Sequence, residues 1–122
     1  MPQTAINTTV PSTQQLVALL MLHLLSEHES LTEYDLRRRI TALSGQSFWR
    51  PGKGTVSDVV RDLLTQGAIE GEWRNQEGRR YRPLQLTPEG QKRLRVLREQ
   101  LREPVIAGRL FFERLKRELY GG

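Results

Sequence analysis

Residue types that carry out catalysis or bind metals are scarce in this sequence. Because it contains no cysteine, thiolate catalysis, disulfides and cysteine metal sites are excluded. The only histidines, His23 and His28, are five residues apart and do not share a helix face. The segment Gly52-Lys53-Gly54-Thr55 lacks the Gly-x-x-x-x-Gly-Lys frame of a phosphate-binding loop. We therefore expect no enzyme, no metal site and no cofactor.

Basic side chains are the functional residues that the sequence does offer. Lys and Arg number 19 against 14 Asp and Glu, which gives a formal charge of +5 and an isoelectric point near 10.2. Such side chains neutralise phosphates and release their counterions. The candidates form three groups. The first is Arg37 and Arg38, beside Arg39, and the second is Arg50 and Lys53. The third is Arg74, Arg79, Arg80 and Arg82.

The length of 122 residues fits one domain, or one domain with an appended helix. The longest apolar run, residues 16–25, is too short to span a bilayer. No Lys or Arg precedes it, so it does not resemble a signal peptide. We expect a soluble cytoplasmic protein without membrane contact. Residues 1–11 are polar, uncharged and contain two prolines, and they predict a flexible arm.

The first two helices are predicted from caps and apolar spacing. One should begin near Ser12 or Thr13 and is apolar on nearly all sides, so a partner subunit is the natural cover for it. The next has Thr32 as its cap and Asp35 three residues later, which resembles a capping box, and it should end at Gly45. Its inward stripe is Leu36, Ile40 and Leu43.

A third helix is predicted to start at Thr55 and to stop at Gly67, and it has the cleanest helical pattern in the chain. Its inward positions are Val56, Val59, Val60, Leu63 and Leu64, and its outward positions are Asp58, Arg61 and Thr65 with Ser57 on the flank. The loop before it contains Phe48 and Trp49, which we expect to pin the loop to the core.

The pattern then changes from a helical period to alternation. Ile69, Gly71 and Trp73 alternate with polar residues, and a second extended run covers residues 79–86. Between them, residues 75–78 predict a hairpin with a four- or five-residue loop. Pro83 confines the second run to a sheet edge. Trp49, Trp73 and Tyr81 are expected to pack in the core or on the sheet; a ligand cage is the alternative.

The final predicted helix begins at Thr87-Pro88-Glu89, with a cap, a proline and an acid in its first turn. Apolar residues then recur every three or four positions, which is typical of a seam for another helix. Pro104 interrupts the seam and predicts a kink or two abutting helices. The expected dimer contacts are Leu97, Leu101, Val105, Phe112, Leu115 and Leu119, with Leu16 and Leu20 of the first helix.

The order of three helices, a basic hairpin and a last helix indicates a winged helix-turn-helix: a mainly α fold with a small β-hairpin wing and a C-terminal dimerisation helix. A helix fits the major groove of duplex DNA, and basic side chains hold phosphates. The predicted contacts are Arg37, Arg38, Arg50, Lys53, Thr55, Ser57, Asp58, Arg61, Arg74, Arg79, Arg80 and Arg82. Arg61 is the best candidate to reach a guanine edge or a phosphate.

Residues 16–94 resemble the PadR family of bacterial transcriptional regulators. The resemblance rests on five stretches, LMLHLL at 20–25, LTEYDL at 31–36, FWRPGKGTV at 48–56, LLTQGAI at 63–69, and RYR at 80–82 followed by LTPEG at 86–90. It implies a repressor-like homodimer that reads a near-palindromic operator with its third helix. Ser57 and Asp58 depart from the Tyr and Pro that the family commonly has there, so the family's contacts at these positions do not transfer.

Alternatives remain for each signal. For the arginines of the second helix, the alternative is an ordinary solvent-exposed face. For Asp58, the alternative is that it only caps its own helix. For the whole chain the alternative is a winged-helix adaptor that binds proteins and has weak or no DNA affinity. The sequence defines no effector. The predicted organisation is the arm at 1–11, the DNA-binding domain at 12–86 and the dimerisation segment at 87–122, with the protein acting at the nucleoid.

Overall fold

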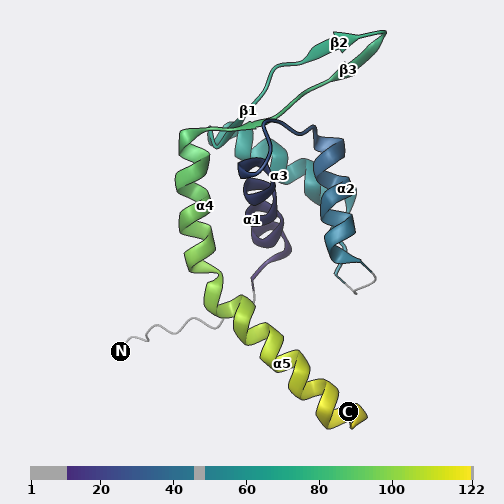
Figure 1. The fold of residues 1–122 in the computed structure, drawn as a ribbon, viewed down its shortest axis with the longest axis vertical. Coiled ribbons are helices and arrows are strands. Elements are labelled where there is room, and N and C mark those ends of the chain that lie inside the picture. Colours follow the sequence, from purple (N-terminus) through teal and green to yellow (C-terminus); the bar gives the residue numbers. More distant parts are fainter. Residues whose placement is uncertain (1–10, 46–48, 122) are drawn as a thin grey trace.

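The computed structural model describes residues 11–45 and 49–121 (Figure 1). The predicted arm up to residue 10 and the predicted anchor Phe48 lie outside these residues. In chain order the elements are α1 (Thr13–Ser26), α2 (Glu33–Ser44), α3 (Lys53–Thr65), β1 (Ile69–Glu70), β2 (Arg74–Gln76), β3 (Arg79–Tyr81), β4 (Gln85–Leu86), α4 (Pro88–Gln100) and α5 (Arg102–Tyr120). The predicted fold class is confirmed.

The core forms around α1, which α2, α3 and α4 surround (Figure 1). Met21 and Leu22 of α1, Leu36 of α2 and Val56 of α3 are fully buried, and Leu94 of α4 joins the same cluster. Each such side chain stabilises the fold by roughly 1.5–3 kcal/mol of transfer free energy. Most of the apolar surface of α1 is therefore covered within its own chain, and Leu16, Leu19 and Leu20 are among the residues that stay half-buried.

Side-chain caps set the starts of α1 and α2 as predicted. The Ser12 hydroxyl accepts from the Gln15 amide, and the Gln15 side chain accepts from the Ser12 amide in return. Thr32 and Asp35 form the same reciprocal pair at α2, at 3.1 Å in both directions. Each cap satisfies amides that would otherwise lack partners in the first helical turn.

The prediction that Leu43 points inward is wrong. Leu43 is exposed, and Ser44 is buried in its place, with its hydroxyl donating to the carbonyl of Ile40 at 3.0 Å. The buried line follows steps of four residues, from Leu36 through Ile40 to Ser44. Such a row winds around the helix, which is expected where two helices cross at an angle.

The start of α3 also differs from the prediction. The helix begins at Lys53 with Gly52 as its N-cap, and no side chain caps it. Thr55 therefore lies inside the first turn, and Asp58 is not the acid of a capping box. The flanking Gly52 and Gly54 are weak helix formers, so the sequence pattern placed the start too late.

The hairpin keeps one register from its base to its tip. Ile69 faces Leu86 at the base, and Arg74 faces Tyr81 near the tip, with no residue inserted between the two ladders. The turn contains only two residues, Glu77 and Gly78, at φ 52° and 77°. The prediction of a four- or five-residue loop is therefore wrong, because two successive left-handed residues close a tight turn whose twist matches the strands.

Backbone pairing within this hairpin is interrupted in the middle. Pro83 has no amide to donate, and Leu84 pairs with Leu31 instead, through bonds of 2.9 and 3.1 Å. Gly71 approaches the opposite strand so closely that a Cβ would lie 2.3 Å from the carbonyl oxygen of Pro83. Leu31 and Leu84 thereby tie the base of the hairpin to the segment that leads into α2.

The last helical region is divided into two helices, as the proline predicted. Pro104 cannot donate to the carbonyl of Gln100, and α4 ends at that residue. The second helix, α5, extends away from the rest of the chain (Figure 1) and contains no buried residue.

Candidate nucleic-acid interface

The outward face of α3 carries the predicted reading residues. Arg61 is exposed, and Ser57 and Asp58 are half-buried on the same side of the helix. The Ser57 hydroxyl donates to Glu33 Oε2 at 2.5 Å, which links α3 to the first turn of α2. Arg61 forms an ion pair with Asp58 one turn earlier. The structure therefore brings these three residues together and gives each an intramolecular partner.

The ion pair on α3 is exposed, with 68% of the Arg61 side chain and 49% of the Asp58 side chain open to solvent. An exposed pair of this kind is worth about 0–1 kcal/mol. Arg61 is consequently able to exchange Asp58 for another anion at little cost. With Lys53 and Asp62 included, the bases and acids of α3 balance, so the helix itself is electrically neutral.

The positive charge of the interface is concentrated in the hairpin. Residues 73–82, which we call the wing, contain one acid, Glu77, and four arginines, Arg74, Arg79, Arg80 and Arg82. Arg82 is half-buried and donates from Nε to the carbonyl of Gly71 at 3.1 Å, whereas the other three are exposed. All four predicted wing residues thus lie on one projecting element.

Of the two places that the sequence predicted for Trp73, the core and the sheet, the structure shows the second, on the hairpin. Trp73 is 54% exposed, and the guanidinium carbons of Arg80 and Arg82 lie 4.6 and 5.4 Å from the centre of its ring. Trp73 faces Arg82 in the hairpin register, so the tryptophan and both arginines share one face of the wing. The signal that sequence reasoning missed is this cross-strand spacing of an aromatic residue and two arginines.

The predicted bases of α2 lie beside the wing. Arg37 and Arg38 have their guanidinium carbons 5.4 and 5.7 Å from the centre of the Tyr34 ring, and Tyr34 is itself exposed. Arg38 is exposed and Arg37 is half-buried. Tyr34 was not among the predicted site residues, although its position one turn before both arginines is readable from the sequence.

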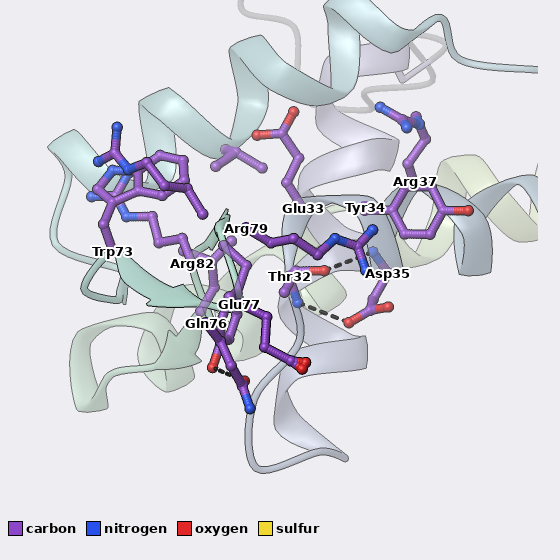
Figure 2. Close-up of a pocket in the computed structure, with 14 residues that line it drawn as sticks. Thr32, Glu33, Tyr34, Asp35, Arg37, Trp73, Gln76, Glu77, Arg79 and Arg82 are labelled. Carbon is purple, nitrogen blue, oxygen red and sulfur yellow. Dashed lines mark hydrogen bonds between the residues drawn. The ribbon is translucent and has the colours of Figure 1, made fainter.

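An open groove of about 780 Å³ separates the wing from the first turn of α2. Figure 2 shows the side chains of the two elements facing one another across it. Its bases are Arg37, Arg79, Arg80 and Arg82, and its acids are Glu33, Asp35 and Glu77. The groove therefore joins the first predicted group, on α2, to the third, on the wing, and its walls carry mixed charge.

The second predicted group stands apart from this groove. Arg50 donates to the carbonyl of Gly45 at 3.2 Å, across the loop between α2 and α3. Lys53 is exposed and Thr55 half-buried in the first turn of α3. None of the three lines the groove. Trp49 beside them packs against the core, as predicted for this loop.

No cluster of three His, Asp or Glu side chains that could hold a metal ion occurs in residues 11–45 and 49–121. Within the same ranges, no helix has both the length and the apolar character needed to cross a bilayer.

Together, the helices, the hairpin and the exposed arginines define a winged helix-turn-helix protein. The chain belongs to the Transcriptional regulator PadR-like family, whose model matches residues 21–96. The resemblance inferred from the sequence is confirmed. A comparison with curated protein sequences found no match.

Solved structures share this fold. One is Bacillus subtilis PadR in complex with operator DNA, with a TM-score of 0.58 and 22% identity over 66% of this chain and 46% of that one. A Streptococcus mutans protein gives a TM-score of 0.64 and 22% identity over 84% and 92%. A PadR family transcription regulator of Clostridium difficile gives 0.58 and 17% over 86% and 98%. The chain spans less than half of the Bacillus subtilis chain.

Proposed function

We propose that this protein is a sequence-specific transcriptional regulator that binds double-stranded DNA as a homodimer and represses transcription. The observation that carries the proposal is the set of four arginines on one projecting hairpin, in a chain that also exposes Arg61 on α3 (Figure 1). Arginines on a projecting hairpin neutralise phosphates, while a neighbouring helix has the width of the major groove. The operator complex of Bacillus subtilis PadR, which has the same fold, supports this assignment.

Each element has a role in this proposal. Arg61 of α3 leaves Asp58 and reads a guanine edge, and Ser57 and Asp58 lie close enough along the helix to meet neighbouring bases. Thr55, Lys53 and Arg50 hold the backbone near the start of α3. The phosphates on either side are bound by the wing bases Arg74, Arg79, Arg80 and Arg82 and by the α2 bases Arg37 and Arg38.

The proposed dimer uses α5. Val105, Phe112 and Leu119 of the predicted seam are about half exposed or more, and Leu115 is half-buried. Leu101, although predicted as a dimer contact, is buried within its own chain, and Leu97 packs against the core. These two residues therefore hold the end of α4 against its own subunit. Beside Leu19 and Val105 lies an apolar depression of about 230 Å³. This depression lies between α5 and the half-exposed side of α1, where Leu16 and Leu20 lie. A second subunit would cover both surfaces.

In this proposal, repression results from the way a dimer occupies DNA. A twofold dimer reads an inverted repeat with two α3 helices one helical turn of DNA apart. Occupying such a site excludes other proteins from the same stretch of duplex. The protein would therefore act on the chromosome, in the cytoplasm at the nucleoid, and no effector needs to be invoked.

A second function is favoured by one observation, the acids Asp58 and Asp62 on the face of α3. They oppose phosphate affinity and suit a winged-helix adaptor that binds proteins. An adaptor would show weak binding to duplex DNA and no preferred sequence.

The test is selection of bound fragments from random duplex DNA with the purified full chain. Recovery of one inverted-repeat motif supports the regulator, and recovery of no motif refutes it. On the selected duplex, Arg61→Ala and Arg80→Ala should each weaken binding, and the logarithmic salt slope should fall by about 0.9 per lost phosphate contact. Arg93→Ala on the exposed side of α4 removes the same charge and should leave the slope unchanged.

A further inference from the structure

The wing contains an arrangement that phosphate binding alone does not require. Trp73 is the only aromatic residue on its face of the wing, and two arginine guanidinium groups lie over its ring. A tryptophan that is 54% exposed contributes little to the hydrophobic core. Its role therefore lies in its contacts with the two arginines.

Guanidinium groups are attracted to the face of an indole, and their planar shape lets them stack on it. Arg82 is held twice, by the Trp73 ring at 5.4 Å and by the bond from Nε to the Gly71 carbonyl at 3.1 Å. That bond uses one of its five donors, so the terminal nitrogens stay available to a phosphate. Arg80 lies closer to the ring, at 4.6 Å, and its side chain is exposed.

The backbone beneath this cluster is closely packed. Gly71 brings the two strands so close that any side chain there would collide with Pro83. Leu84 is bonded to Leu31 on the other side. Trp73 and Arg82 therefore adjoin this packed base, and the short ladder of β2 and β3 beyond it carries Arg80.

We propose that Trp73 is a positioning residue that orders the guanidinium groups of Arg80 and Arg82 on one face of the wing before DNA arrives. Arginine side chains lose rotamer freedom when they bind a phosphate. Stacking on Trp73 removes part of that freedom in the free protein, so binding costs less. This inference rests on the proposed function and adds a specific residue to it.

The experiment measures binding to a 30-base-pair duplex of random sequence by fluorescence anisotropy, between 50 and 200 mM KCl. Trp73→Ala and Trp73→Leu should each weaken binding about fivefold at every salt concentration, because two cation–π contacts are lost. Their logarithmic salt slopes should equal that of the wild type, since no phosphate contact disappears. Arg80→Ala should lower the slope by about 0.9. Trp73→Phe keeps an aromatic face and should retain most of the affinity.

The outcomes separate the two ideas. A wild-type chain that binds no duplex refutes the proposed function, and this inference falls with it. If the wild type binds and Trp73→Leu binds equally well, the inference alone is overturned. It is also overturned if Trp73→Phe is as weak as Trp73→Leu, or if Trp73→Leu lowers the slope as Arg80→Ala does. Equal melting temperatures of Trp73→Leu and Trp73→Phe would exclude a general loss of structure as the cause.

Discussion

Gly90, in the first turn of α4, packs against Ala68, which lies between α3 and β1, and replacing Gly90 with alanine should push α4 away from that segment. A Cβ at Gly90 would lie 2.0 Å from the carbonyl oxygen of Ala68 and 2.6 Å from Leu86 Cδ1. Real Cβ atoms keep at least 3.0 Å from such neighbours, so α4 has to move by about 1 Å. The movement would stretch the bond from the Thr87 hydroxyl to Gly67, which is 2.6 Å long, and the bond from the Thr87 amide to Ala68, at 3.1 Å.

The expected destabilisation follows from these contacts. Overpacking costs about 1–3 kcal/mol, and each weakened hydrogen bond costs about 1 kcal/mol. Alanine has a higher helix propensity than glycine, which offsets about 1 kcal/mol of this cost. The free energy of unfolding should therefore fall by about 2–4 kcal/mol, which lowers Tm by roughly 10 °C for a chain of this size.

The assay is thermal unfolding followed by circular dichroism, at one protein concentration for all variants because dimer formation would shift Tm. Gly54→Ala is the matched control, since a Cβ at Gly54 would meet no atom within 4 Å. It should raise the free energy of unfolding by about 0.5–1 kcal/mol. A Gly90→Ala protein that melts within about 2 °C of the wild type would refute the reasoning.

Three further predictions concern the caps, the dimer and the reading helix. Thr32→Ala removes the capping box of α2 and should cost about 1 kcal/mol in urea unfolding; an unchanged midpoint would contradict this. Val105→Glu places a charge on the apolar side of α5 and should convert dimers to monomers in light scattering, whereas Lys116→Glu should not. Asp58→Asn removes a negative charge from the proposed docking face of α3 and should tighten binding to random duplex about threefold at 50 mM KCl, with the gain lost at 500 mM. Equal or weaker binding at low salt would argue against α3 as the docking face.

The parts of the fold that the sequence predicted well depend on contacts between near neighbours. The capping pair Thr32 and Asp35, the cap Thr87 and the break before Pro104 each involve residues at most four positions apart, so spacing alone reveals them. The burial of Ser44 in place of Leu43 depends on the angle at which α2 crosses its neighbours, and that angle is not readable from the pattern of one helix.

In the candidate site too, local features were predictable and contacts between distant residues were not. The wing arginines follow from alternation and charge. The partnership of Ser57 with Glu33 joins residues 24 positions apart, and that of Trp73 with Arg82 depends on a two-residue turn that the sequence analysis took to be longer. Because the turn length sets which residues face one another across a hairpin, the predicted four-residue loop would place Trp73 opposite Arg80 rather than Arg82.

The gap in pairing at the middle of the hairpin has a consequence for amide protection. The strands stay close at Pro83 and Leu84, but no ladder hydrogen bond joins them there to transmit cooperativity from the base to the tip. The outer pair of strands should therefore open as a separate unit, and its amides should exchange with deuterium far sooner than those at Ile69 and Leu86. Contact with a duplex would slow exchange at Asn75 and Arg80 while leaving the base unaltered, and this difference would map the bound segment without crystals.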